Sequence, residues 1–156
     1  MKKDIGAYTY EQLQKEIEML GEKTFRAKQV YEWIHVKLAS SFEEMTNVSK
    51  ELRKKLDDHY IILPVREVER QVSKLDGTNK FLFELYDGNM VESVLMRYKH
   101  GNSVCISSQV GCRMGCRFCA STIGGLVRNL SPSEMLGQIY QIQKITNCLL
   151  YTSRCV

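Results

Sequence analysis

The chain has 156 residues and a formal net charge of +4, and its 44% hydrophobic and 26% charged residues exclude an intrinsically disordered protein. No apolar stretch reaches the roughly 18 residues of a membrane span, and Met1-Lys-Lys-Asp-Ile leads into polar sequence rather than the apolar core of a signal peptide. We therefore expect a cytoplasmic globular protein with no membrane partner.

Residues 1–63 predict a small helical domain. Leu13, Ile17 and Leu20 recur at helical spacing, and Gly21 is placed to end that first helix. Ser49 is a suitable N-cap for a third helix. The second helix, over about residues 25–38, and the third helix carry apolar residues at the same spacing: Phe25, Val30, Trp33, Ile34 and Leu38, then Leu52 and Leu56.

The opposite faces of the second and third helices are basic. The residues concerned are Lys23, Arg26, Lys28 and Lys37, then Arg53, Lys54 and Lys55. A basic helical module can bind RNA phosphates, although charge runs are more often solvated faces without a partner. Composition alone leaves both interpretations open.

Residues 64–100 predict an antiparallel β meander that leads into the core. Strand-like runs over residues 65–75, 80–86 and 90–98 are separated by Asp76-Gly77 and Asp87-Gly88. Asp-Gly between alternating apolar runs is a strong hairpin signal.

Glu92 interrupts the third of these strands. The two-residue period places it on the side of Met90, Val94 and Met96, so it would be a carboxylate on an otherwise apolar face. A buried carboxylate is costly unless it is paired or used. The residues alone leave open a shifted register or a paired structural glutamate.

Residues 101–147 predict one strand, one loop and one helix. Residues 103–107 are expected to form the first strand of a barrel, and Ser131-Pro-Ser-Glu134 combines a capping box with proline at the first helical position. One side of that helix is expected to carry Leu136, Ile139, Tyr140 and Gln143. The order is that of one βα unit, whose active site lies beyond the strand's C-terminal end. The expected fold class is therefore α+β and α/β.

The loop after that strand carries the motif Cys112-Arg-Met-Gly-Cys116-Arg-Phe-Cys119. Three thiolates at this spacing can bind three irons of a [4Fe–4S] cluster and leave the fourth iron open for chemistry. Zinc is the main alternative, with Cys105 or Cys148 as a fourth ligand, although structural zinc sites usually use two separate cysteine pairs. An electron-transfer cluster with a fourth native ligand is a further alternative.

The motif and its flanks resemble a known enzyme family. The cysteine triplet with Phe118 is similar to the signature of radical S-adenosylmethionine (SAM) enzymes. The segments that resemble the RlmN/Cfr family of radical SAM RNA methyltransferases are 25–33, 41–46, 91–94, 103–112 and 124–130. The closer match is the RlmN branch, which methylates adenine C2 in 23S ribosomal RNA and in tRNA, whereas the Cfr branch methylates C8.

The resemblance implies two cofactors and several partners. Cys112, Cys116 and Cys119 would bind a [4Fe–4S] cluster, with Phe118 beside it, and SAM would bind the open iron. The implied partners are 23S rRNA, tRNA and a one-electron donor such as flavodoxin, and the protein would be a monomer. Residues 1–63 would be an accessory RNA-binding domain.

The resemblance also implies two catalytic residues. Glu92 matches the family's proton acceptor, and burial would raise its pKa toward useful base strength. Cys105 matches the thiol that helps to resolve a covalent adduct between enzyme and RNA. In that mechanism a second, late cysteine is first methylated by SAM and ends in a disulfide bond with the Cys105 equivalent.

The last nine residues, 148–156, match nothing in the family. They can be encoded by an inverted DNA repeat that looks like two transposase ends used in sequencing-library preparation, so we expect a non-native tail after a break near Asn147. The late cysteine, a Gly-Glu-Pro SAM segment and further βα units are absent, and we expect the 156-residue polypeptide to be inactive. If the tail is natural, a zinc- or cluster-stabilised RNA-binding module becomes the leading alternative.

Overall fold

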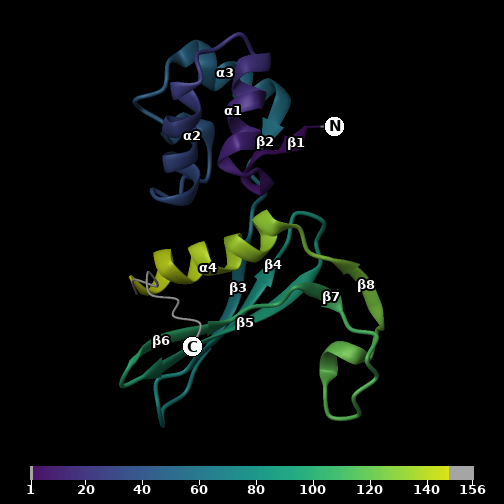
Figure 1. Cartoon of the computed structure of the whole chain (residues 1–156). Coiled ribbons are helices and arrows are strands. Elements are labelled where there is room, and N and C mark those ends of the chain that lie inside the picture. Colours follow the sequence, from purple (N-terminus) through teal and green to yellow (C-terminus); the bar gives the residue numbers. More distant parts are fainter. Residues whose placement is uncertain (1, 148–156) are drawn as a thin grey trace. The chain divides into compact units, whose positions relative to one another are not determined.

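The computed structural model describes residues 2–147 (Figure 1). The chain divides after Leu63 into two compact units. The expected tail, residues 148–156, lies outside the described residues. Among those described, no helix combines the length and apolar character needed to cross a bilayer.

The first unit is mainly helical. Its elements are β1 (Lys3–Asp4), η1 (Ile5–Ala7), α1 (Tyr10–Met19), α2 (Phe25–His35), η2 (Phe42–Glu44), α3 (Lys50–His59) and β2 (Tyr60–Ile61). The two short strands β1 and β2 pair in parallel and so join the two ends of the unit.

The helix ends of the first unit follow local signals in the sequence. Gly21 adopts a φ of +76° just after α1, and the N–H groups of Gly21 and Glu22 close the helix by donating to the carbonyls of Glu18 and Ile17. The Ser49 hydroxyl accepts the Leu52 N–H at 3.3 Å, as expected of an N-cap.

The second helix is shorter than expected. It ends at His35, and the chain then turns through Leu38, whose φ is +58°. The Ala39 N–H donates to the Trp33 carbonyl at 2.8 Å across this turn. Leu38 is buried in the turn rather than on the helix.

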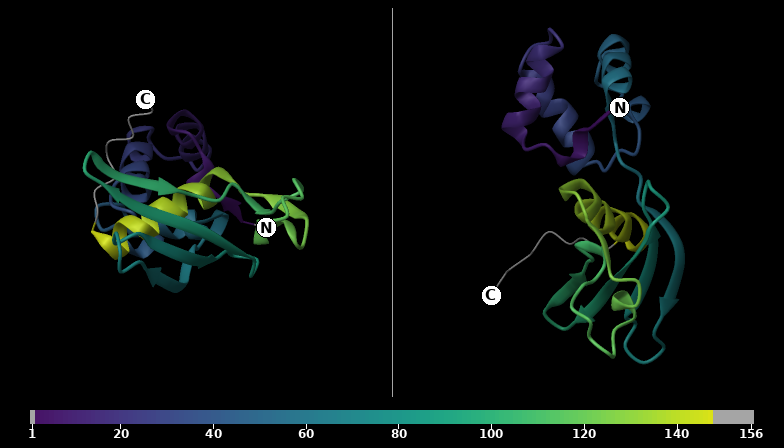
Figure 2. Two further views of the ribbon diagram at one scale, coloured as in Figure 1. Left: turned by 90° about the horizontal axis from the view of Figure 1, so that it is seen from below. Right: turned by 90° about the vertical axis from the view of Figure 1, so that its right-hand side faces the viewer.

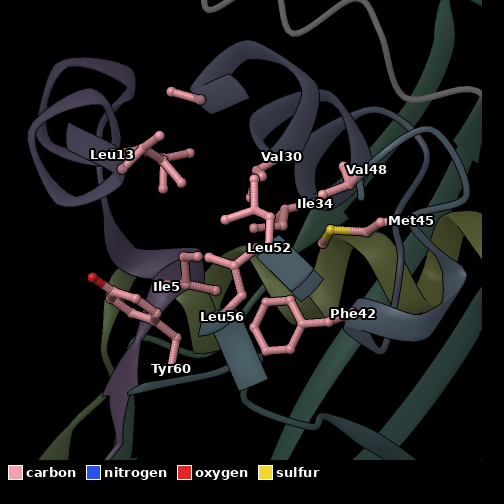
Figure 3. Close-up of a cluster of buried hydrophobic side chains, with 12 residues drawn as sticks. Ile5, Leu13, Val30, Ile34, Phe42, Met45, Val48, Leu52, Leu56 and Tyr60 are labelled. Atoms are coloured by element: carbon pink, nitrogen blue, oxygen red, sulfur yellow. The ribbon is translucent and has the colours of Figure 1, made fainter. Parts of the chain in front are cut away.

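The core of the first unit joins all three α-helices (Figure 3). The predicted apolar positions Leu13, Ile17, Val30, Ile34, Leu52 and Leu56 are all buried, together with Phe42, Met45 and Val48 from the connecting segment. Phe25 was expected on this face but is half exposed and lies against the Arg26 guanidinium. The first residue of α2 therefore lies at the edge of the core, although Ala27 in the same turn is buried.

The second unit contains a four-stranded sheet, a two-stranded ladder and one α-helix. Its elements are β3 (Arg66–Val72), β4 (Asn79–Glu84), β5 (Met90–Tyr98), β6 (Gly101–Cys105), β7 (Gln109–Gly111), η3 (Ala120–Thr122), β8 (Leu126–Asn129) and α4 (Pro132–Thr146). The sheet order is β3-β4-β5-β6, and every neighbouring pair is antiparallel. Gly77 and Gly88 occupy the left-handed region at the two Asp-Gly turns, as the hairpin signal requires.

The strand expected to begin the barrel is joined to the meander. It spans Gly101–Cys105 rather than 103–107 and pairs antiparallel with β5. Tyr98 lies opposite Gly101, so only Lys99 and His100 connect the two strands. Such a short connection permits antiparallel pairing only, and β6 is the edge of the described sheet.

Helix α4 lies against one face of this sheet (Figures 1 and 2). Its buried residues are Glu134, Gln138 and Ile142, at intervals of four. The residues expected along one side of this helix, at positions 136, 139, 140 and 143, are only partly buried, so the helix packs on a different side. The apolar residues that share this core are Val65, Phe81, Phe83, Leu85, Val91, Leu95, Val110 and Leu130.

Candidate active site

The three cysteines of the motif lie on the loop between β7 and β8, seen as the projecting green segment in Figure 1. β7 and β8 pair antiparallel, and the Cys112 N–H donates to the Gly125 carbonyl at 3.0 Å. Gly111 has a φ of +71°, and a Cβ atom there would lie 1.9 Å from that carbonyl oxygen. The base of the loop therefore requires glycine at position 111.

Thr122 organises the inside of the loop. Its hydroxyl lies 3.1 Å from the Cys116 carbonyl and 2.8 Å from the Cys119 carbonyl. The Cys119 N–H donates to the Cys116 carbonyl at 3.1 Å, and the Met114 N–H points at the Cys112 sulfur at 3.5 Å. Hydrogen bonds within the loop thus hold the backbone around all three thiols.

The donor set of this loop fits a thiolate-bound cluster in its chemistry. Cys112, Cys116 and Cys119 are free thiols, each partly exposed, within eight residues. Among residues 2–147, however, no three Cys, His, Asp or Glu side chains are gathered as a metal site. Phe118 beside them is 94% exposed, so an aromatic side chain stands uncovered next to the thiols.

Arg128 links the cysteine loop to the rest of the second unit. Its guanidinium donates two bonds to the buried Glu134 carboxylate, at 2.7 and 2.9 Å, and a third, at 2.7 Å, to Asp87. The Ser131 N–H also donates to Glu134, which completes the predicted capping box of α4. Arg128 was not singled out from the sequence. The capping box predicted the local role of Glu134, and the Asp-Gly turn predicted that of Asp87. Neither signal indicated a contact with Arg128.

The charges of this network shift the pKa values of both acids. The Arg128 hydrogen bond lowers the pKa of Asp87 to about 2, from an ordinary value of 3.8. Burial tends to raise the pKa of Glu134, but the bonds from Arg128 and the Ser131 N–H outweigh that effect and leave it below its ordinary value. Both acids are therefore held in the charged form.

Acid should weaken this network. Because both carboxyl pKa values are lower in the folded chain than in the unfolded one, the stabilisation is complete above about pH 5 and falls as pH drops from there toward 2. We expect Arg128→Gln to cost about 3 kcal/mol at pH 7, since it leaves Glu134 buried without its partner. Thermal unfolding at pH 7 and pH 3 should show a smaller difference between the variant and the wild type at pH 3. Arg97→Gln, on the exposed end of β5, is the control, and an equal loss in both variants would contradict the assignment.

Glu92 lies on the open face of the sheet. Its side chain is 54% exposed and pairs with Lys80 at 2.7 Å. The expectation that Glu92 is buried was wrong, because α4 covers the other face of β5, where Val91, Ser93 and Leu95 are buried. Met90, Val94 and Met96 do share the side of Glu92, as the two-residue period predicted, but that side is the less covered one.

Cys105 shares this open face with Glu92. It ends β6, is exposed, and lies opposite Val94 of β5. Glu92 is two residues from Val94 and so occupies a diagonal position relative to Cys105, a spacing of roughly 7–8 Å in antiparallel sheets. The structure thus places the two predicted catalytic residues on one surface.

Gln138, a residue that the sequence did not single out, fixes the chain just after Cys105. Its side-chain oxygen accepts the Ser93 hydroxyl at 2.7 Å and the Ser107 N–H at 2.9 Å, and its side-chain nitrogen donates to the Ser107 carbonyl at 2.9 Å. The Ser107 hydroxyl in turn donates to the Glu92 carbonyl at 2.7 Å. A buried glutamine on α4 therefore sets the backbone that connects the Cys105 strand to the cysteine loop.

Comparison with known proteins assigns both units to one kind of protein. Residues 4–62 match the family described as "Ribosomal RNA large subunit methyltransferase N-terminal domain". The chain is 65% identical over 145 residues to "Probable dual-specificity RNA methyltransferase RlmN" of Lachnoclostridium phytofermentans, an alignment that covers 93% of this chain and 41% of that protein. The protein of the same name from Bacillus subtilis is 55% identical over 124 residues, covering 80% of this chain and 34% of its own length.

A solved structure is similar to this chain in fold. The crystal structure of a radical SAM methyltransferase from Sphaerobacter thermophilus superimposes with a TM-score of 0.82 at 35% identity, over 93% of this chain and 42% of that one. The chain thus spans about two fifths of the length of the relatives that it matches.

Proposed function

Because this chain belongs to the RlmN family, we propose that it forms the front part of a radical SAM enzyme that methylates adenine C2 in 23S ribosomal RNA and in tRNA. The observation that carries the proposal is the 65% identity over 145 residues to a protein named as an RNA methyltransferase. An alignment of that length in a chain of 156 residues extends across the cysteine motif, Glu92 and Cys105.

Three cysteines would hold the cofactor. In this proposal Cys112, Cys116 and Cys119 bind a [4Fe–4S] cluster, with the exposed Phe118 side chain beside it. When bound, the cluster and SAM supply one-electron chemistry that can reach an unactivated adenine carbon. The chain itself keeps the loop in place through the Gly111 turn and the Arg128 contacts to Asp87 and Glu134.

Cys105 and Glu92 would complete the reaction on the open face of the sheet. The Cys105 thiolate attacks the sulfur of the enzyme's second cysteine, and an S–S bond forms as the sulfur–carbon bond to the transferred carbon breaks. The electron pair passes to that carbon, which takes up a proton to become the methyl group. Glu92, held by Lys80, accepts the proton that leaves the adenine carbon.

The remaining assignments follow from the same family. We propose residues 1–63 as an accessory RNA-binding domain, residues 64–100 as the meander that carries Glu92, and residues 101–147 as the part that bears Cys105 and the cofactor loop. The reaction would take its electron from a donor such as flavodoxin.

A chimeric protein tests this function. Residues 1–147 of this chain would replace the matching front part of the Lachnoclostridium phytofermentans relative. We expect the chimera, with SAM and a one-electron reductant, to convert adenine to 2-methyladenine in a 23S rRNA fragment, as measured by mass spectrometry of the digested RNA. Cys116→Ala should abolish the product. An inactive chimera beside an active parent relative would refute the proposal, and methylation at C8 would assign the chain to the Cfr branch.

A further inference from the structure

The first unit carries a hollow between η2 and α3 that the proposed reaction does not use. Its volume is about 700 Å³, and it is lined by Ser41, Phe42, Glu43, Lys50, Arg53, Lys54 and Asp57. Phe42 is buried and belongs to the core cluster of the first unit, as Figure 3 shows. The hollow therefore lies directly beside that core.

Three cations and two acids, Glu43 and Asp57, line the hollow. Within residues 2–147, neither Lys50 nor Lys54 forms an ion pair, and both side chains are exposed. Lys55, on the next position of the same helix, is paired with Glu22 at 2.8 Å. Asp57 is already paired with Lys2 at 3.4 Å, so it does not neutralise the two lysines.

Arg53 is oriented but largely unused. Its Nη1 donates to the Glu43 carbonyl at 2.9 Å, which fixes the guanidinium at the wall of the hollow. Its Nε is buried and has no hydrogen-bond acceptor among the described residues. A guanidinium offers five N–H donors in a planar fork that matches the oxygens of a phosphate group. Nε itself is closed off from solvent, so a phosphate in the hollow would meet the Nη groups of Arg53 rather than Nε.

We propose that this hollow binds a backbone phosphate of the RNA substrate, with Arg53 as its central contact and Lys50 and Lys54 as flanking charges. The inference rests on the proposed function, because that function supplies RNA as the partner. Phosphate contacts of this kind position an RNA without reading its sequence. The hollow would thus hold the RNA at the first unit independently of the base that is methylated.

Salt-dependent RNA binding by the 156-residue chain tests the site. Fluorescence anisotropy with a labelled RNA hairpin would compare the wild type with Arg53→Gln and Lys54→Gln over a series of salt concentrations. We expect both variants to bind more weakly and to lower the slope of log K against log salt by about one. Lys15→Gln, an exposed lysine of α1 away from the hollow lining, removes the same charge and should leave the slope almost unchanged.

Equal slopes in Lys54→Gln and Lys15→Gln would overturn the proposal. Lys54 is exposed and unpaired among the described residues, so this comparison decides the matter even if Arg53→Gln fails to fold. A titration with inorganic phosphate alone, followed by the NMR resonance of the Arg53 Nε–H, distinguishes a site for free phosphate from a site for an RNA phosphate. A shift with phosphate but no effect of the variants on RNA binding would mean an anion site that RNA does not use, and would reject the RNA assignment.

The test is independent of catalysis. If methyl transfer by the chimera fails while the hollow variants still weaken RNA binding, the proposed reaction is rejected and the site is kept. Conversely, an active chimera whose chain binds RNA equally well with and without Arg53 would keep the reaction and reject the site.

Discussion

Replacing Gly111 by alanine is expected to abolish loading of the cysteine loop with iron and sulfide. The left-handed φ of +71° at this position costs an ordinary residue about 1–2 kcal/mol. In addition, the new Cβ would meet the Gly125 carbonyl oxygen at 1.9 Å, so the backbones of β7 and β8 must separate. An isolated two-stranded ladder is only marginally stable, and we expect it to be lost together with the bond from the Cys112 N–H.

Anaerobic reconstitution with iron and sulfide measures this effect. The wild-type chain should become brown, with broad absorbance at roughly 400 nm from iron–sulfur charge transfer, and should carry bound iron. Gly124→Ala is the matched control, since position 124 has an ordinary φ and no atom within 4 Å of the added Cβ. Normal iron loading in Gly111→Ala would contradict the structural argument. A colourless wild-type protein that retains zinc would instead overturn the cluster assignment.

Replacing Cys105 by alanine in the chimera is expected to eliminate 2-methyladenine while leaving the cluster intact. Without this thiol no S–S bond can form, so the bond between the second cysteine and the transferred carbon is not broken. RNA should therefore remain attached to the protein, and denaturing gel electrophoresis with labelled RNA would reveal the adduct. Iron content should match that of the unmodified chimera, because Cys105 lies on β6 rather than on the cysteine loop.

The iron content of Cys105→Ala also shows whether Cys105 is a catalytic thiol or a ligand of the cluster. If Cys105→Ala removes the iron, Cys105 is a fourth ligand and the site is a fully ligated electron-transfer cluster. Glu92→Gln is a useful second variant, since Glu92 shares the open face with Cys105. We expect slower product formation without loss of iron, and an unchanged rate would remove Glu92 from the mechanism.

Local structure was well determined by the sequence. The helix stop at Gly21, the cap at Ser49 and the capping box at Ser131 are all confirmed, as are the Asp-Gly hairpins of the meander. Each depends on a backbone conformation or a hydrogen bond within a few residues of the signal. The cysteine motif and its flanking segments likewise indicated the family that the comparisons show.

The choice of buried faces was decided by the tertiary structure. The two-residue period correctly grouped Glu92 with its neighbours, but a period does not tell which side of a sheet another element will cover. Helix α4 covers the opposite side, so Glu92 is open and paired with Lys80. For the same reason α4 buries Glu134 and Gln138, since these two polar residues find partners in Arg128, Ser93 and Ser107.

The contacts that hold the candidate sites are the part that the sequence by itself did not reveal. Arg128 meets Asp87 across 41 positions of the chain, and Gln138 meets Ser93 across 45. Arg53 is one of several basic residues in the sequence, and the structure adds its bond to the Glu43 carbonyl and its buried Nε, which has no acceptor among the described residues. The sequence determined which chemical groups are available, whereas long-range packing determined which of them are buried, paired or left without a partner.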